Sequence, residues 1–210
     1  PVYHGPLLYH LTALAFVLFG HNDVTARLGV TLMGVGIAVM PLFLRRWLGK
    51  VGVLCATLLM AVSPVLMHRS RFLRHDQGAI LFNLILFIAL LIYLERPRTK
   101  YLYIVAAAVA LGFAAKETTF ITYFIFGTFL AALLLWQWWQ RGERSLRAFT
   151  RLPAFDVIVV MGTLILPLAT PFPIKMLGRD PVDYSQSGIY FSGAVFMVML
   201  AISAAVGLWW

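Results

Sequence analysis

Long apolar runs alternate with short clusters of charged residues along the whole chain. Crossing the roughly 30 Å hydrocarbon core of a bilayer takes about 20 helical residues. Runs that reach or approach this length are predicted at 25–44, 51–67, 78–94, 101–115, 118–139, 153–170 and from 189 onward. In lipid each segment has to satisfy its own backbone hydrogen bonds, so such runs are helical. The pattern predicts an all-α, polytopic transmembrane helical bundle with about seven spans.

The first apolar run, residues 7–19, is too short to span a bilayer at 13 residues. Pro6 suits the first turn of a helix, and Gly20 suits its end. We therefore expect an interfacial helix that lies along the membrane surface. Residues 1–210 are then expected to form a single transmembrane domain, in which residues 1–24 are an outer loop with this juxtamembrane helix and residues 25–210 contain about seven spans, the last incomplete. The chain opens on PVYHGP and closes on the apolar VGLWW, which we interpret as a membrane domain truncated at both ends.

The composition changes which partners are expected. With 61% hydrophobic and 12% charged residues, the chain does not resemble a soluble protein. Its formal charge of +9 would suit nucleic acid, but the basic residues lie in short loops between apolar runs, so no nucleic acid partner is expected. The single cysteine, Cys55, lies inside an apolar run, which excludes an internal disulfide and a cysteine metal site.

Alternation of the spans sorts the loops into two sets. One set holds ten of the 17 basic residues, in the loops near 45–50, 95–100 and 140–151. Positive charge marks the cytoplasmic side of a membrane, so this set is predicted to be cytoplasmic. The other loops then face outward, and they contain most of the residues that suggest chemistry.

The segment 67–79, MHRSRFLRHDQGA, is the most charged of the outward loops. If it is helical, Arg71, Arg74 and His75 share one face. Such a group can hold a phosphate, with arginine supplying bidentate contacts. Two simpler interpretations stay open: a collar that binds lipid headgroups without specificity, and an Asp76 that only caps the next helix.

Other outward-facing residues are candidates for substrate binding. Lys116 and Glu117 end an unusually short span, where ionisable residues are costly and suggest function; the alternative is a snorkelling lysine paired with its neighbour. His4 precedes the interfacial helix and either contacts substrate or fills a turn. Arg27 either reaches a phosphate or pairs with Asp23. The charged residues of the proline-rich loop predicted at 171–188 are expected to be solvated: Lys175, Arg179, Asp180 and Asp183.

Four segments in order resemble a family of membrane enzymes. They are YHGPLLYHLTALAFVLFG, NDVTARLGVTLMGV, SPVLMHRSRFLRHDQG and ERPRTKYLYIVAAAVALGFAAKET. Together they resemble the GT-C glycosyltransferases, and in particular the dolichyl- or polyprenyl-phosphate-mannose–protein mannosyltransferases of the prokaryotic branch described as flippase-activity-associated. The resemblance covers about residues 1–140.

The resemblance implies a GT-C-like fold and an inverting transfer of a sugar, such as mannose, from a polyprenyl-phosphate carrier. It implies a hydroxyl acceptor on a protein or glycan, and an active face outside a prokaryotic plasma membrane. Arg74 and Asp76 match the family's second outer motif, and Lys116 matches its phosphate-contacting lysine. His4 falls at its substrate-proximal proline turn. The family's catalytic acid is expected before Pro1, so the chain alone is expected to be inactive.

The chemistry of sugar transfer suits these residue types independently. The leaving phosphate gains charge that fixed arginine and lysine side chains would stabilise, and a carboxylate has to deprotonate the acceptor hydroxyl. Asp76 is expected to act as a donor-site acid that contacts the sugar or holds a divalent metal, rather than as that base. No cofactor is certain. A flippase or transporter and a non-catalytic membrane scaffold are the alternatives, although a transporter is expected to carry charges near the membrane midplane.

Overall fold

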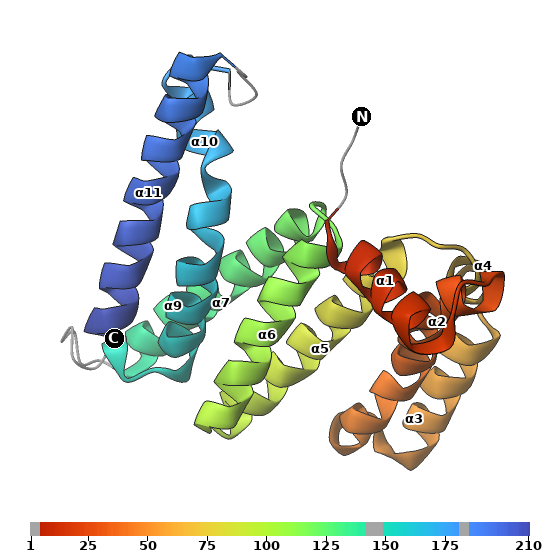
Figure 1. The fold of residues 1–210 in the computed structure, drawn as a ribbon. Helices are drawn as coiled ribbons and strands as arrows, with labels where there is room; N and C mark the ends of the chain where they lie inside the picture. The colour runs from red at the N-terminus through yellow and green to blue at the C-terminus, as the bar shows by residue number, and fades with distance from the viewer. Residues whose placement is uncertain (1–4, 142–148, 181–184) are drawn as a thin grey trace. The chain divides into compact units, whose positions relative to one another are not determined.

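The structure is a computed structural model that describes residues 5–141, 149–180 and 185–210. Within these residues every regular element is an α- or 3₁₀-helix (Figure 1), which confirms the predicted all-α bundle. The chain divides into two compact units, Pro1–Phe126 and Gly127–Trp210. Helix α7 (Thr119–Arg141) begins in the first unit and continues into the second.

The first unit opens with the short helix α1 (Leu7–Phe19), whose bounds agree with the sequence prediction. Pro6 precedes it, and Gly20 ends it with a φ of 81° that glycine tolerates best. α1 packs against α2 (Asp23–Val39). Asn22 caps α2 by accepting a hydrogen bond from the Thr25 amide at 2.7 Å. Whether α1 lies in a membrane surface stays a prediction.

Proline divides the next two predicted spans. α2 gives way to the 3₁₀-helix η1 (Met40–Leu44), where Pro41 cannot continue an α-helical hydrogen-bond ladder. The chain then turns back, and α3 (Arg45–Val62) lies beside α2 (Figure 1), with a non-helical residue at Gly49. The expected helix over 51–67 is also divided, because Pro64 starts a separate helix, α4 (Pro64–Arg71).

The core of the first unit lies between α5 (Asp76–Glu95) and α6 (Thr99–Ala115), which run side by side (Figure 1). Leu86 of α5 and Val105 and Val109 of α6 are completely buried. Side chains in a protein interior pack closely against one another, and these buried residues join the two helices in this way. The first residue of α5 is Asp76 and its last is Glu95, so these two acids lie at opposite ends of the helix.

In the second unit, α9 (Pro153–Ile165), η2 (Pro167–Ala169) and α10 (Pro171–Met176) pack against α11 (Gln186–Trp209). The Ser203 hydroxyl donates a hydrogen bond to the Thr163 carbonyl. The prediction of a loop over 171–188 is wrong at both of its ends, since α10 occupies the first part and α11 begins at Gln186. Pro171 and Pro173, two of the prolines that suggested a loop, instead occupy the start of α10, where proline is favoured, and Pro181 and Asp183 lie outside the described residues.

Four helical stretches among the described residues are long and apolar enough to cross a membrane. They are Asp23–Val62, Asp76–Glu95, Thr119–Gln140 and Gln186–Trp209. A fifth is possible if α9 and the helix that follows it, bent by 49°, act as one span. α1 and α6 are shorter. The predicted total of seven spans, which counts α2 and α3 separately and includes α6, stays a prediction.

The predicted sidedness can be tested at the two ends of α5. Leu73 precedes α5 and is 48% exposed, and Thr99 follows it and is also exposed. In a Cys55→Ala background of the full-length protein, we expect Leu73→Cys to react with an impermeant thiol reagent added outside cells, and Thr99→Cys to react only after permeabilisation. The reverse pattern would place the Asp76 end of α5 in the cytoplasm. Gln77 is unsuited as a reporter because it is fully buried.

Candidate functional site

Asp76, the first residue of α5, collects three cations from three segments of the first unit. Its Oδ1 accepts a hydrogen bond from Nζ of Lys116, which follows α6, and its Oδ2 accepts one from Nη1 of Arg69 in α4. Nε of Arg74, in the linker between α4 and α5, lies 3.5 Å from the same Oδ2. We call these four residues the Asp76 cluster.

Within the Asp76 cluster the anion is the most buried residue, and the cations are increasingly exposed. The Asp76 side chain is only 8% exposed, and that of Lys116 is 24% exposed. The Arg69 and Arg74 side chains are 40% and 66% exposed. Three positive charges face one negative charge, so the cluster carries a formal surplus of two positive charges. Because the carboxylate is buried and the two arginines are exposed, the surplus positive charge lies at the protein surface, and this surface attracts anions.

Close packing of α4 on α2 and α5 brings Arg69 to the cluster. A Cβ on Gly34 of α2 would lie 2.7 Å from the Cβ of Ser70, so only glycine allows this approach. The Thr31 hydroxyl donates a hydrogen bond to the Ser70 carbonyl at 3.3 Å. The buried Gln77 amide of α5 donates another to the Leu66 carbonyl at 3.0 Å. These contacts fix the last turn of α4 beside the start of α5.

The turn between α6 and α7 places Lys116. The buried Thr119 hydroxyl lies 2.6 Å from the Lys116 carbonyl and 3.1 Å from the Gly112 carbonyl, so it ties the turn to the last turn of α6. The Tyr123 hydroxyl, also buried, donates to the Ala108 carbonyl at 3.0 Å. Tyr123 reaches that carbonyl by passing over Gly112, where a Cβ would lie 1.9 Å from its hydroxyl oxygen.

The structure unites some of the predicted site residues and separates others. Arg74, Asp76 and Lys116 come together, although Lys116 is 40 residues after Asp76 in sequence. His75 precedes α5, and its ring lies edge-on to Tyr9 of α1 at 5.4 Å. The remaining candidates are not part of the cluster: Arg27 is exposed on α2, Arg71 is exposed at the end of α4, Glu117 is exposed beyond Lys116, and His4 lies outside the described residues.

Two expectations about this segment are wrong. Arg71, Arg74 and His75 do not share a helix face, because α4 ends at Arg71 and α5 begins only at Asp76. Asp76 is not the helix cap either; His75 occupies that position, and Asp76 lies in the first turn of α5. A carboxylate there still interacts favourably with the helix dipole. The sequence left open that Lys116 pairs with its neighbour Glu117. In the structure Lys116 instead donates a hydrogen bond to Asp76.

Arg69 is the member of the cluster that sequence reasoning left out of the site. It lies seven residues before Asp76, a spacing that a continuous helix would also bring near one face. The contact here instead arises because the chain leaves the helix at Phe72 and re-enters it at Asp76. The feature of the sequence that indicates a separate helix carrying Arg69 is Pro64, which occupies the first turn of α4.

A metal is not favoured at Asp76 in this arrangement. Both carboxylate oxygens already contact cations, which would repel a divalent ion. Among the described residues no group of three or more histidine, cysteine, aspartate or glutamate side chains is placed to hold a metal ion.

The helices long enough to span a membrane, and the charged cluster at one end of α5, define a polytopic α-helical membrane protein. Residues 3–169 match the family model described as dolichyl-phosphate-mannose-protein mannosyltransferase, so the chain belongs to this family of GT-C-type membrane glycosyltransferases. The match confirms the resemblance and extends it past residue 140 through α9 and η2. No curated protein and no solved structure matches the chain.

The burial of Asp76 predicts a large difference between two similar substitutions. Asp76→Asn leaves three cations without their counter-ion, and we expect it to destabilise the protein by about 2–3 kcal/mol. This is less than the roughly 3–5 kcal/mol for a fully buried pair, since the arginines are partly exposed. Glu95→Gln breaks the exposed pair with Arg46 and should cost at most about 1 kcal/mol. Thermal unfolding of both variants in detergent tests this; equal shifts would contradict it.

The packing of Tyr123 over Gly112 gives a second stability prediction. Gly112→Ala has to displace the Tyr123 hydroxyl, and overpacking of this kind costs about 1–3 kcal/mol. Gly127→Ala, also inside a helix but with open space around its Cβ, is the matched control and should be neutral or stabilising by up to about 1 kcal/mol. Thermal unfolding should rank Gly112→Ala below the wild type and Gly127→Ala at or above it.

Proposed function

We propose that the Asp76 cluster holds the phosphate of a polyprenyl-phosphate sugar at the outer face of a prokaryotic plasma membrane. The protein would transfer this sugar, a hexose such as mannose, to a hydroxyl group on a protein or glycan acceptor. The observation that carries the proposal is the surplus of two positive charges at the protein surface beside a buried carboxylate. Membership of the mannosyltransferase family supports a lipid-linked donor.

The charge of the cluster suits the change that the donor undergoes. A polyprenyl-phosphate sugar is a phosphodiester with one negative charge. When the bond between the sugar carbon and the phosphate oxygen breaks, the leaving group is a phosphate monoester, which carries about −1.5 to −2 at pH 7. Cations fixed in advance stabilise the charge that develops in the transition state more than the charge of the ground state. Arg69, Arg74 and Lys116 would supply this stabilisation.

In this proposal Asp76 positions the cations and does not act as the base. A base needs a free lone pair within reach of the acceptor hydroxyl. Lys116 contacts one oxygen of Asp76, and Arg69 and Arg74 contact the other. The acceptor oxygen attacks the sugar carbon, the phosphate leaves with the bonding electrons, and the acceptor proton passes to a carboxylate that is not Asp76.

The location of charge favours a transferase over the transporter alternative. A transporter is expected to hold ionisable groups near the membrane midplane, at broken helices. In the three candidate spans that are single helices, α5, α7 and α11, no charged side chain lies in the interior, and Asp76 and Glu95 lie at the two ends of α5. The basic residues 45, 46 and 50 of the longer stretch Asp23–Val62 lie where α2 and η1 give way to α3. A cluster at one membrane face suits a reaction whose acceptor arrives from water.

Alanine substitutions in the full-length protein test the proposal. We expect Arg74→Ala and Lys116→Ala each to lose at least about 2 kcal/mol of transition-state stabilisation, about 30-fold in kcat/KM, because a charged contact to phosphate is removed. The assay is transfer of mannose from polyprenyl-phosphate mannose to a hydroxyl-bearing peptide in lipid vesicles. Arg74 is the more informative variant, since its exposed side chain contributes at most about 1 kcal/mol to stability.

Arg151→Ala is the control, because Arg151 is an exposed arginine between α7 and α9 and lies outside the Asp76 cluster. It should retain activity close to that of the wild type. If all three variants lose activity equally, the losses reflect general misfolding. If Arg74→Ala keeps full activity, the Asp76 cluster is not the phosphate site.

A further inference from the structure

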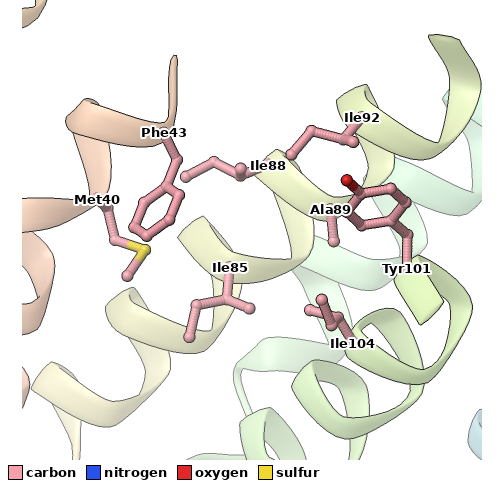
Figure 2. Close-up of a pocket in the computed structure, with 8 residues that line it drawn as sticks. All are labelled: Met40, Phe43, Ile85, Ile88, Ala89, Ile92, Tyr101 and Ile104. Carbon is pink, nitrogen blue, oxygen red and sulfur yellow. The ribbon is translucent and has the colours of Figure 1, made fainter. Parts of the chain in front are cut away.

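A second feature of the first unit lies at the opposite end of α5 from the Asp76 cluster. A pocket of about 360 Å³ opens between η1, α5 and α6 (Figure 2). Met40 and Phe43 of η1 form one side, the α5 side chains form the centre, and Tyr101 and Ile104 of α6 form the other side. The volume is within the range of about 300–1,000 Å³ typical of small-molecule sites. Every lining residue is apolar except for the phenol hydroxyl of Tyr101.

Charged residues lie one helical turn beyond this pocket. Ile92 is three residues before Glu95 in α5, which corresponds to about 5 Å along the helix, and Phe43 is three residues before Arg46, across the junction of η1 and α3. Arg46 Nη1 and Glu95 Oε2 are 2.6 Å apart, and the Trp47 indole donates to the other Glu95 oxygen at 2.8 Å. On the α6 side, Lys100 Nζ lies 5.0 Å from the centre of the Tyr101 ring.

The charge at this end is strongly positive. The segments 45–50 and 95–100 carry six basic residues, all exposed, against the single acid Glu95. Glu95 forms an ion pair with Arg46, and with one acid against six basic residues most of the positive charge in these segments is available to a ligand. Anionic lipid headgroups are attracted to such clusters by about 1 kcal/mol for each lysine or arginine near the membrane surface.

We propose that this pocket binds one acyl chain of an anionic phospholipid whose phosphate lies among the cations of the segments 45–50 and 95–100. The pocket lining is apolar, and the basic residues of the two segments lie about one helical turn beyond it. A phospholipid has the same sequence of groups, an apolar acyl chain followed by a charged headgroup. Trp47 and Tyr101 lie at the boundary, the position that such side chains favour in membranes. The site is separate from the proposed donor site, because the two lie at opposite ends of α5.

Photo-crosslinking of the full-length protein tests this proposal. The probe is phosphatidylglycerol with a photoactivatable group on one acyl chain, and phosphatidylcholine with the same chains is the comparison. We expect adducts on residues 40–44 and 85–92, at least about 5-fold more abundant with phosphatidylglycerol at equal mole fraction, as expected for one or more headgroup contacts. Lys100→Gln should lower this preference at least twofold, within the roughly 5-fold effect of one such contact.

Variants that fill the pocket provide a second test. Ala89→Phe places a ring inside the pocket, whereas Ala107→Phe adds the same ring to an exposed position of α6. We expect Ala89→Phe to lose most of the adducts and Ala107→Phe to keep them. Ile104→Trp, at a 40% exposed position of the pocket wall, gives the same test should Ala89→Phe fail to fold.

Several results would overturn the proposal. Equal adduct formation with the two phospholipids would remove the charge argument, and equal losses in Ala89→Phe and Ala107→Phe would place the lipid elsewhere. An absence of pocket adducts in the wild type would show that another part of the protein covers this site. Competition by polyprenyl phosphate as strong as that by phosphatidylglycerol would assign the pocket to the donor lipid instead.

Discussion

The contact between the Asp76 carboxylate and three cations is the interaction on which this end of the first unit depends. It joins the end of α4, the linker before α5 and the turn after α6, which no backbone ladder connects. Removing charges from water is costly, and the cost is recovered only when each charge has a well-placed partner. The carboxylate serves all three cations at once, so like charges that would repel one another can occupy one small region.

This arrangement would allow the proposed phosphate site to form before phosphate arrives. Without Asp76, Arg69, Arg74 and Lys116 would separate to reduce their repulsion, and a ligand would have to draw them back. With the carboxylate buried beneath them, the cations are held in advance and still retain a surplus charge. Preorganised charge of this kind is the form of electrostatic stabilisation that costs least at the moment of reaction. Arg74, the most exposed of the three, has the greatest freedom to turn toward a ligand.

The apolar runs predicted the helices well because length and hydrophobicity alone decide whether a segment is helical in lipid. The bounds of α1 and the positions of α5 and α6 follow from this rule. The break between α4 and α5 could not be predicted in the same way. There the choice between one continuous helix and two depends on contacts far away in sequence, such as that of Ser70 with Gly34 and that of Asp76 with Lys116. The same limit explains why Arg69 was left out, while Lys116 and Asp76 were named separately but not as partners.

The two acids of α5 show how burial decides what a charged residue can do. Asp76 lies at the N-terminus of α5, where the helix dipole favours a negative charge, and Glu95 lies at the C-terminus, where the dipole opposes it. Asp76 is buried and fixes three cations. Glu95 is more exposed, and its contacts with Arg46 and Trp47 offset the unfavourable position without ordering the other cations nearby. One end of α5 therefore holds its positive charges in a fixed geometry, as recognition of one phosphate requires. The other end leaves most of its cations exposed, which suits the proposed contact with the headgroup of an anionic phospholipid.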